Sequence, residues 1–247
     1  MKTLRQTVRL TFENLRSQHR DGQLVFWNYG FFLLLLLLFL SALGRDPSVR
    51  VVLVGGLVTI GVMGTALFSV GIGMSAARDR GIYRRLSMFP VPVSRFLWAA
   101  VLSRWVVTFA SATIQIGAAR LLFGVTWPGG AWAWIIGLAL GSATFCSIGF
   151  AIAGLAKASH RANAYANVVF VPMLVLSGVA LPVGFLPEWV RPASALLPAS
   201  ALVNLLQGTI IRGEGVSAAL GSITNLIVWG LVAGVIGAVA WRRRGLN

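Results

Sequence analysis

The sequence predicts an all-α membrane protein with six transmembrane helices, an N-terminal amphipathic interface helix and a broken re-entrant segment before the last span. Three observations support this prediction. The 247 residues are 57% hydrophobic and only 11% charged, whereas roughly 25% of residues are charged in a soluble domain. Several runs of about 20 residues carry almost no charge, which is the length of helix that crosses a bilayer. The segments between these runs alternate between rich and poor in Lys and Arg.

The first element is expected to be a helix over residues 1–22. At about 100° per residue, four apolar side chains form one stripe and four arginines cluster on the adjoining flank: Leu4, Val8, Phe12 and Leu15, then Arg5, Arg9, Arg16 and Arg20. Such a helix lies in the membrane interface with its cations towards anionic head groups. A solvated basic tail is the alternative. Because the segment has no signal-peptide core or cleavage site, the first apolar run is expected to be a retained anchor.

Six apolar stretches follow as candidate spans, at residues 25–43, 51–77, 96–122, 131–156, 162–180 and 216–241. The first contains FFLLLLLLFL, which is apolar all round, as expected of a helix that faces lipid. No stretch is left over for a soluble domain. The whole chain, residues 1–247, is therefore expected to be a single transmembrane domain.

Basic residues predict the orientation of these spans. They concentrate in four segments: Lys2 with Arg5, Arg9, Arg16 and Arg20; Arg78, Arg80, Arg84, Arg85 and Arg95; Lys157 and Arg161; and Arg242, Arg243 and Arg244. The segments between are poor in Lys and Arg or have their cations balanced by acids. By the positive-inside rule, both termini and the arginine-rich loop face the cytoplasm. The same rule accounts for the net charge of +15, so no nucleic-acid partner is expected.

Two features inside the spans need an explanation. Arg104 lies about eight residues into the third span, where a guanidinium is costly. It either snorkels back to the cytoplasmic interface or pairs inside the bundle. The patterns GLALG (137–141) and GLVAG (230–234) allow close approach of helix backbones, although they identify no particular interface.

Prolines interrupt the apolar region before the last span. Pro182, Pro187, Pro192 and Pro198 recur every five or six residues, and each removes a backbone donor and clashes with the preceding turn. A continuous helix therefore cannot cross there. Because broken helix at membrane depth must pack against protein or line a cavity, residues 181–204 are interpreted as short re-entrant or interfacial helices that cap the outer face.

The chain carries no recognisable catalytic or cofactor chemistry. Its six acidic residues are scattered outside the predicted spans, and neither His19 nor His160 forms part of a metal-binding or nucleophilic cluster, so no metal site is expected. No G-x-x-x-x-G-K-[ST] phosphate loop occurs, which excludes ATP hydrolysis by that route. An ion-coupled carrier usually has Asp, Glu or His within its spans, and here the spans have none. The energy for any transport is therefore expected to come from another subunit.

Two motifs resemble the membrane subunit of type-2 ATP-binding-cassette (ABC) exporters. RDRGIYRRLSMFPV (78–91) is similar to the family pattern of charged residues, glycine, a basic-leucine pair and proline. LSGVALPVGFLPEWVRPASALLP (176–198) is similar to its Ser-Gly, Pro, Pro-x-Trp and Leu-Pro series. The resemblance covers nearly the whole chain. One departure is Ala77, where the family often has a glutamate four residues before the loop glycine; Asp79 is the nearby acid that can take that role.

The resemblance implies a half-transporter in a bacterial plasma membrane. It would pair with a second membrane subunit, a copy of itself, and bind two ABC ATPase subunits that hold ATP and Mg²⁺. The segment 78–94 would receive the ATPases through these residues: Arg78, Asp79, Arg80, Gly81, Ile82, Tyr83, Arg84, Arg85, Leu86, Phe89 and Pro90.

The residues of this segment fit that role physically. Ile82, Leu86 and Phe89 form an apolar stripe that can seat in a groove, and the flanking arginines can pair with acidic partner residues. Gly81 permits a turn, and the prolines end the helix. A basic loop that only sets topology remains the alternative.

The substrate class is inferred from the resemblance alone. Small external loops resemble the drug- and antibiotic-export branch, which moves hydrophobic or amphipathic compounds. Export of a polysaccharide or lipid-linked glycan, a non-transporting scaffold and an autonomous secondary carrier are alternatives. The residues expected at the path or outer gate are Asn163, Asn167, Ser177, Gly178, Pro182, Pro187, Trp189 and Pro198. Helix–helix hydrogen bonding explains the polar ones equally well.

Overall fold

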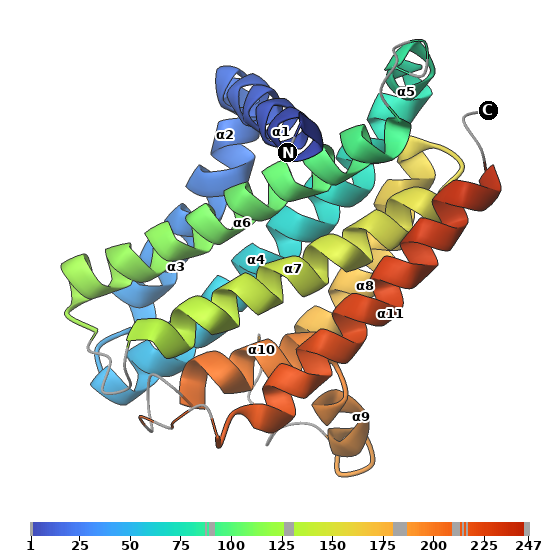
Figure 1. Ribbon diagram of the computed structural model, residues 1–247. Helices are drawn as coiled ribbons and strands as arrows, with labels where there is room; N and C mark the ends of the chain where they lie inside the picture. Colours follow the sequence, from blue (N-terminus) through green and yellow to red (C-terminus); the bar gives the residue numbers. More distant parts are fainter. Residues whose placement is uncertain are drawn as a thin grey trace.

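The computed structural model describes residues 2–86, 88, 92–125, 131–179, 187–208, 213, 215 and 217–244, and the regular structure of these residues is entirely helical. The elements in chain order are α1 (Lys2–Arg20), α2 (Gly22–Val25), the π-helical turn η1 (Phe26–Gly30), α3 (Phe31–Leu43), α4 (Pro47–Asp79), α5 (Ile82–Leu86), α6 (Val93–Phe123), α7 (Ala131–Leu155), α8 (Ser159–Leu176), α9 (Arg191–Ala195), α10 (Pro198–Gln207) and α11 (Leu220–Arg244). The long helices form one bundle (Figure 1).

Five helical stretches are long and apolar enough to cross a membrane. They are Gly22–Leu43, Val49–Asp79, Ser94–Phe123, Ile135–Leu155 and Leu220–Arg243, and each overlaps a span predicted from the sequence. The sixth predicted span corresponds to α8, which is 18 residues long and is not among the five. Its first half carries His160, Arg161, Asn163 and Asn167, and these polar residues lower its hydropathy.

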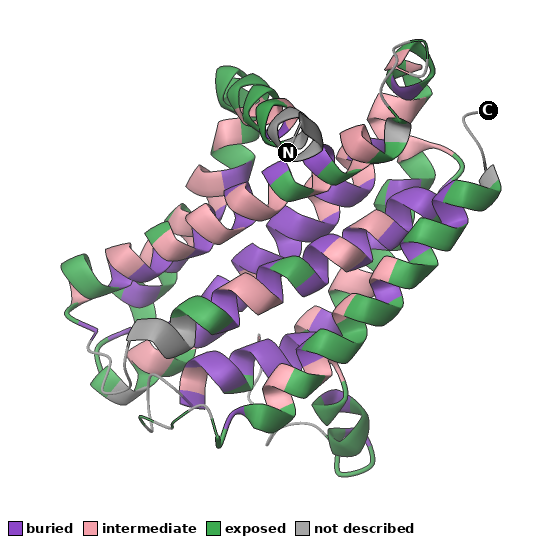
Figure 2. Ribbon diagram, in the orientation of Figure 1, coloured by how far each residue is buried: buried purple, intermediate pink, exposed green. Residues whose placement is uncertain are grey.

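The centre of the bundle is formed by α4 and α7. Their buried side chains include Val58, Met63, Phe145 and Cys146, and Figure 2 shows buried residues along both helices. Gly149 lies where the two helices cross: a Cβ at this position would lie 2.9 Å from the carbonyl oxygen of Ala66. A glycine is therefore required for the two backbones to pack this closely.

This crossing gives a first testable prediction. A leucine at position 149 would push its side chain against the backbone of α4. Because overpacking of this kind is destabilising, we expect Gly149→Leu to lower the stability by about 1–3 kcal/mol. The measurement is the thermal unfolding midpoint of the purified chain in detergent. The matched control is Gly234→Leu on α11, where an added Cβ meets no atom within 4 Å. Equal midpoints for Gly149→Leu and the wild type would contradict the packing described here.

The two predicted small-residue patterns serve different contacts. Leu205 and Leu202 of α10 pack against Gly137 and Gly141, respectively. The GLALG pattern therefore contacts a short helix and not a full span. In the second, Gly230 lies against Thr144 of α7, whose hydroxyl donates to the carbonyl of Leu226 at 2.9 Å. Both patterns therefore bring elements onto α7.

The proline-rich region contains two short helices instead of one long one. α9 and α10 each begin with a proline in the first turn, and most of the α10 side chains are buried against the bundle (Figure 2). Ser194 of α9 donates a hydrogen bond to the carbonyl of Leu176 at the end of α8, and Ser200 of α10 donates to the carbonyl of Ser194 at 2.6 Å. These hydroxyls connect the three helices where the chain leaves α8.

The N-terminal helix α1 packs across α6, and Gln18 donates to the hydroxyl of Ser103 at 3.3 Å. Its protein-facing side carries polar Thr11 and Gln18. Two residues of the predicted apolar stripe point elsewhere, since Phe12 is 65% exposed and Val8 is also exposed, whereas Leu15 is half-buried. Val8 and Phe12 therefore form an exposed apolar part of α1.

Candidate functional site

The arginine-rich segment forms a separate short helix at one end of the bundle. α4 ends at Asp79, the backbone turns at Gly81 with φ of +68°, and α5 follows. A Cβ at Gly81 would meet nothing within 4 Å, so the glycine is required by the left-handed backbone and not by crowding. In Figure 1, α5 lies at the same end of the bundle as α1 and the C-terminus.

Tyr83 anchors α5 to the last helix. Its side chain is 5% exposed and meets the ring of Trp241 edge-on, with centroids 5.5 Å apart. Trp241 in turn stacks on Phe150 of α7 at an interplanar angle of 8°. Burial raises the pKa of the Tyr83 phenol, while Arg104 and Arg78 oppose the shift. These rings connect α5 to α7 and α11.

Arg78 and Asp79 connect the end of α4 to the turn between α7 and α8. The Arg78 guanidinium donates to the carbonyls of Ala153, at 3.1 Å, and Ala156, and its Cζ lies 5.3 Å from the centroid of the Trp241 ring. Asp79 Oδ2 accepts from the backbone N–H of Ser159 at 2.7 Å. The cation thus lies at the C-terminus of α7 and the anion at the N-terminus of α8, as helix dipoles favour.

The predicted ATPase contacts divide into inward- and outward-facing residues. Tyr83 faces inward, which corrects its expected place on the docking surface, because the aromatic contact with Trp241 buries it. Leu86 packs partly against the core. The exposed ones are Asp79, Arg80, Ile82, Arg84 and Arg85; Phe89 and Pro90 lie outside the described residues.

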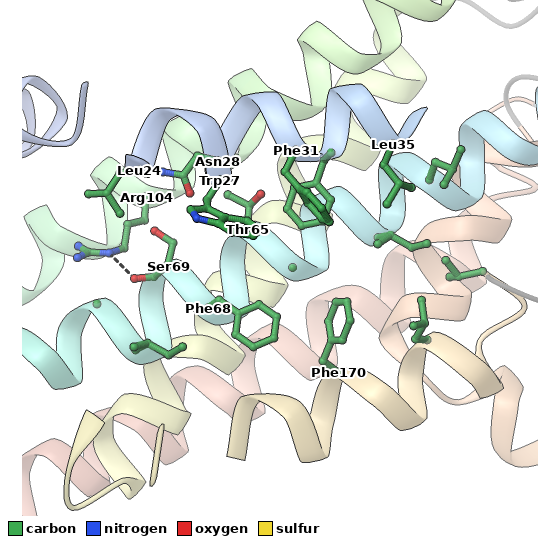
Figure 3. Close-up of a pocket in the computed structure, with 18 of the residues that line it drawn as sticks. Leu24, Trp27, Asn28, Phe31, Leu35, Thr65, Phe68, Ser69, Arg104 and Phe170 are labelled. Atoms are coloured by element: carbon green, nitrogen blue, oxygen red, sulfur yellow. Dashed lines mark hydrogen bonds between the residues drawn. The ribbon is translucent and has the colours of Figure 1, made fainter. Parts of the chain in front are cut away.

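A second candidate site is a groove of about 1510 Å³ along the bundle. The first span, α4 and α8 line it, and Figure 3 shows Trp27, Phe31, Phe68 and Phe170 around the same space. On α4 the lining residues run from Val49 to Ala76. At 1.5 Å per residue this is about 40 Å, enough to extend through the bilayer core.

The π-helical turn η1 places Trp27 and Asn28 in the groove wall. Such turns free backbone groups from the regular helical pattern and occur often at functional sites. Here the carbonyl of Asn28 accepts a hydrogen bond of 2.6 Å from the hydroxyl of Ser111 on α6. That bond fixes the turn against α6 and satisfies a buried carbonyl.

One end of the groove is polar. Gln18, Asp21, Arg80, Arg104 and Asn163 lie there. The guanidinium of Arg104 donates from Nε to the carbonyl of Ser69 at 2.8 Å and from Nη1 to that of Ala100 at 3.0 Å (Figure 3). The structure therefore gives the Arg104 guanidinium one backbone acceptor on α4 and one on its own helix, α6.

The residues predicted for the path or gate lie in different environments: some line the groove, some are buried elsewhere and some are exposed. Asn163 and Gly178 line the groove, at its polar and its opposite end. Asn167 donates to Asn163 Oδ1 at 3.1 Å, one turn along the exposed side of α8. Ser177 and Pro198 are buried, Pro187 and Trp189 are exposed, and Pro182 lies outside the described residues.

Most of the groove wall could not be recognised from the sequence. Phe31, Phe68 and Phe170 lie within predicted spans, and nothing in their local sequence distinguishes them from other apolar span residues. The signal that could have found the groove was the depth of Arg104 in its span. A cation there needs acceptors or a polar cavity, and the structure supplies both.

Comparison with known proteins decides which class of protein carries this architecture. The model of the ABC-2 type transporter family matches residues 5–211. The chain belongs to this family. Together with its five long apolar helices, ABC-2 membership makes the chain a multi-pass membrane protein and confirms the predicted resemblance at the level of the family.

The relatives of this ABC-2 chain have several names. It is 23% identical over 173 residues to the inner membrane transport permease YhhJ of Escherichia coli (strain K12), covering 69% of this chain and 46% of the relative. Nodulation protein J of Rhizobium leguminosarum bv. viciae is 28% identical over 66% of this chain and 60% of its own length. The linearmycin resistance permease protein LnrN of Bacillus subtilis (strain 168) is 25% identical over 81% and 51%. The chain thus spans about half the length of the curated relatives that it matches.

Proposed function

We propose that the chain is the membrane subunit of an ATP-driven exporter that moves hydrophobic or amphipathic compounds out of the cytoplasm or the inner leaflet. Family membership carries this proposal. ATP and Mg²⁺ would bind to two separate ATPase subunits. A copy of the same chain would form the second half of the transporter, in a bacterial plasma membrane.

In this proposal α8 is the sixth span. It packs on α4 and α7 and runs along the bundle in Figure 1. Its 18 residues correspond to about 27 Å of helix, close to the thickness of the hydrocarbon core. An even number of spans brings both termini to one side, and the positive-inside rule makes that side the cytoplasm.

The same proposal places α1 in the cytoplasmic membrane interface. Val8 and Phe12 are exposed although apolar, and the arginines Arg9, Arg16 and Arg20 occupy the adjoining flank. A helix with these faces can insert its apolar stripe between acyl chains while its cations contact anionic head groups. On the opposite face of the bundle, α9 and α10 would form the re-entrant cap.

ATPase docking would use the outward side of α5. Ile82 supplies an exposed apolar contact, and Arg84 and Arg85 flank it with cations. A hydrophobic anchor with a charged rim is a common arrangement at protein interfaces. Because Tyr83, Arg78 and Asp79 tie this segment to α11, α7 and α8, a displacement of α5 would reach three long helices.

The groove supports the export path. It is predominantly apolar and extends along the bundle, and a second copy facing it would enclose the path between two such walls. One of the three relatives described above is named a linearmycin resistance permease protein, and the apolar wall of the groove favours a hydrophobic or amphipathic compound over a polysaccharide. A glycan would require a more polar wall than the groove provides.

The test is ATP hydrolysis by the purified complex of this chain with its ATPase subunit in lipid nanodiscs. We expect vanadate-sensitive activity that rises with a transported compound. Ile82→Asp should lower the stimulation at least tenfold, because it places a charge in the docking contact. Leu121→Asp, at an apolar residue of α6 that is 84% exposed near the opposite end of the bundle, should leave it unchanged. Transport driven by an ion gradient without ATP would contradict the proposal, as would equal activities of the two variants.

A further inference from the structure

Arg104 is a cation inside the membrane-spanning part of the bundle with no carboxylate within ion-pair distance among the described residues. A guanidinium has five N–H donors, and carbonyl oxygens of Ser69 and Ala100 accept two of them. The second terminal nitrogen, Nη2, lies beside Gly73, where a Cβ would be only 2.9 Å from it. The side chain keeps part of its surface exposed, and it lines the groove.

The other polar groups at this end strengthen its positive character. Of the described residues that line the groove, the charged ones are Arg80, Arg104 and Asp21. The Asp21 carboxylate already accepts the backbone N–H groups of Gln23 and Leu24 as the cap of α2. Asn163 uses its Oδ1 to accept from Asn167, which leaves its NH₂ group to donate. An acidic group bound beside Arg104 would therefore meet its guanidinium, and the one acidic side chain among the described residues that line the groove, Asp21, is already used as a helix cap.

The rest of the groove is apolar. Trp27 and Phe68 follow Arg104 along the groove, and Phe31 and Phe170 lie further on (Figure 3). The polar end is on the side of the bundle where α4 finishes at Asp79. A bound molecule would therefore have its polar group at that end and its apolar part along the aromatic wall.

We propose that this groove binds a single-chain amphiphile with one acidic head group, which lies at Arg104. Arginine pairs with carboxylate or phosphate through charge-assisted, often bidentate hydrogen bonds, and one such guanidinium matches one acid. A membrane-forming phospholipid with two acyl chains is a different occupant. The inference deepens the proposed function by naming a substrate class, and it rests on that function only for the step from binding to export.

The test measures binding to the full-length chain alone, in phosphatidylcholine nanodiscs, with empty nanodiscs subtracted. The probe is 11-(dansylamino)undecanoic acid, compared with its uncharged methyl ester. We expect the wild type to prefer the acid at least tenfold, and dodecanoate to displace the probe while dodecylamine does not. Equal affinities for acid and ester would overturn the proposal. Displacement by dioleoyl phosphatidylglycerol but not by dodecanoate would also overturn it, because the site would then belong to a membrane lipid.

Three variants locate the site. Arg104→Gln should abolish the preference for the acid, while Arg104→Lys should keep part of it. Arg120→Gln is the matched control, on the same helix but exposed near its other end, and it should keep the full preference. A preference retained in Arg104→Gln would overturn the assignment to this residue. If that variant does not fold, Gly73→Ala decides: its methyl group must displace Nη2, so a weakened preference supports the site and an unchanged one overturns it.

The outcome is separable from that of the proposed function. The binding measurement contains no ATPase subunit, so a failure to couple ATP hydrolysis leaves it intact. Conversely, a complex that hydrolyses ATP normally while the chain binds acid and ester alike would refute the acidic substrate and leave the exporter proposal standing.

Discussion

Replacing Trp241 with alanine is expected to lower the stability of the chain by about 3–5 kcal/mol, the usual cost of truncating a buried large aromatic residue. The substitution removes the stack on Phe150, the edge-on contact with Tyr83 and the cation–π contact with Arg78. It therefore detaches α5 from α11. We also expect ATP hydrolysis in the assembled complex to lose its response to transported compound.

Trp98→Ala is the matched control for that prediction. It removes the same side chain from a position that is 67% exposed, so the midpoint of thermal unfolding and the coupling should stay unchanged. Unfolding in detergent gives the first readout, and compound-stimulated ATP hydrolysis gives the second. If Trp241→Ala unfolds at the wild-type temperature and remains coupled, the aromatic anchor has no role in holding α5.

Substitution of Gly81 is expected to uncouple the complex with little change in the rest of the bundle. The φ of Gly81, +68°, is incompatible with proline, whose ring fixes φ at about −65°. An alanine can adopt this positive φ, but at a cost of about 1–2 kcal/mol of stability. An added side chain meets no atom within 4 Å, so any effect comes from the backbone. Gly81→Pro should abolish compound-stimulated hydrolysis, and Gly81→Ala should weaken it.

Gly117→Ala is the control that separates backbone strain from the loss of a glycine. Gly117 on α6 also has nothing within 4 Å of an added Cβ, but its φ lies outside the positive range. The change should leave both coupling and stability intact. A Gly81→Pro complex that still hydrolyses ATP in response to compound would show that this turn does not transmit movement.

Much of the helical layout could be predicted from local sequence. Apolar runs placed the long helices within a few residues of their observed ends, since hydrocarbon thickness sets their length. The turn at Gly81 and the short helix after it followed from glycine and the residues beyond, because these features are encoded within a few positions. The sixth span was predicted by the same rule, but α8 is only partly apolar and its polar first half separates it from the others.

The contacts between distant segments could not be predicted in this way. Tyr83 was included among the ATPase contacts with the rest of its segment, whereas its burial depends on Trp241, which lies far away in the sequence. The pattern at Gly137 and Gly141 suggested a helix pair without naming the partner, and the partner is the short α10. The groove arises from the way the first span, α4 and α8 pack, so no single segment encodes it.

The most direct test of the central claim is cross-linking between α5 and the ATPase subunit. A single cysteine at position 82 carries a short photoactivatable reagent; the one native cysteine, Cys146, is buried. We predict an adduct with the ATPase subunit from Ile82→Cys and from Arg85→Cys, and none from Trp189→Cys at the other end of the bundle. Absence of adducts at both α5 positions, or an equal yield from position 189, would contradict the assignment of α5 as the ATPase docking helix.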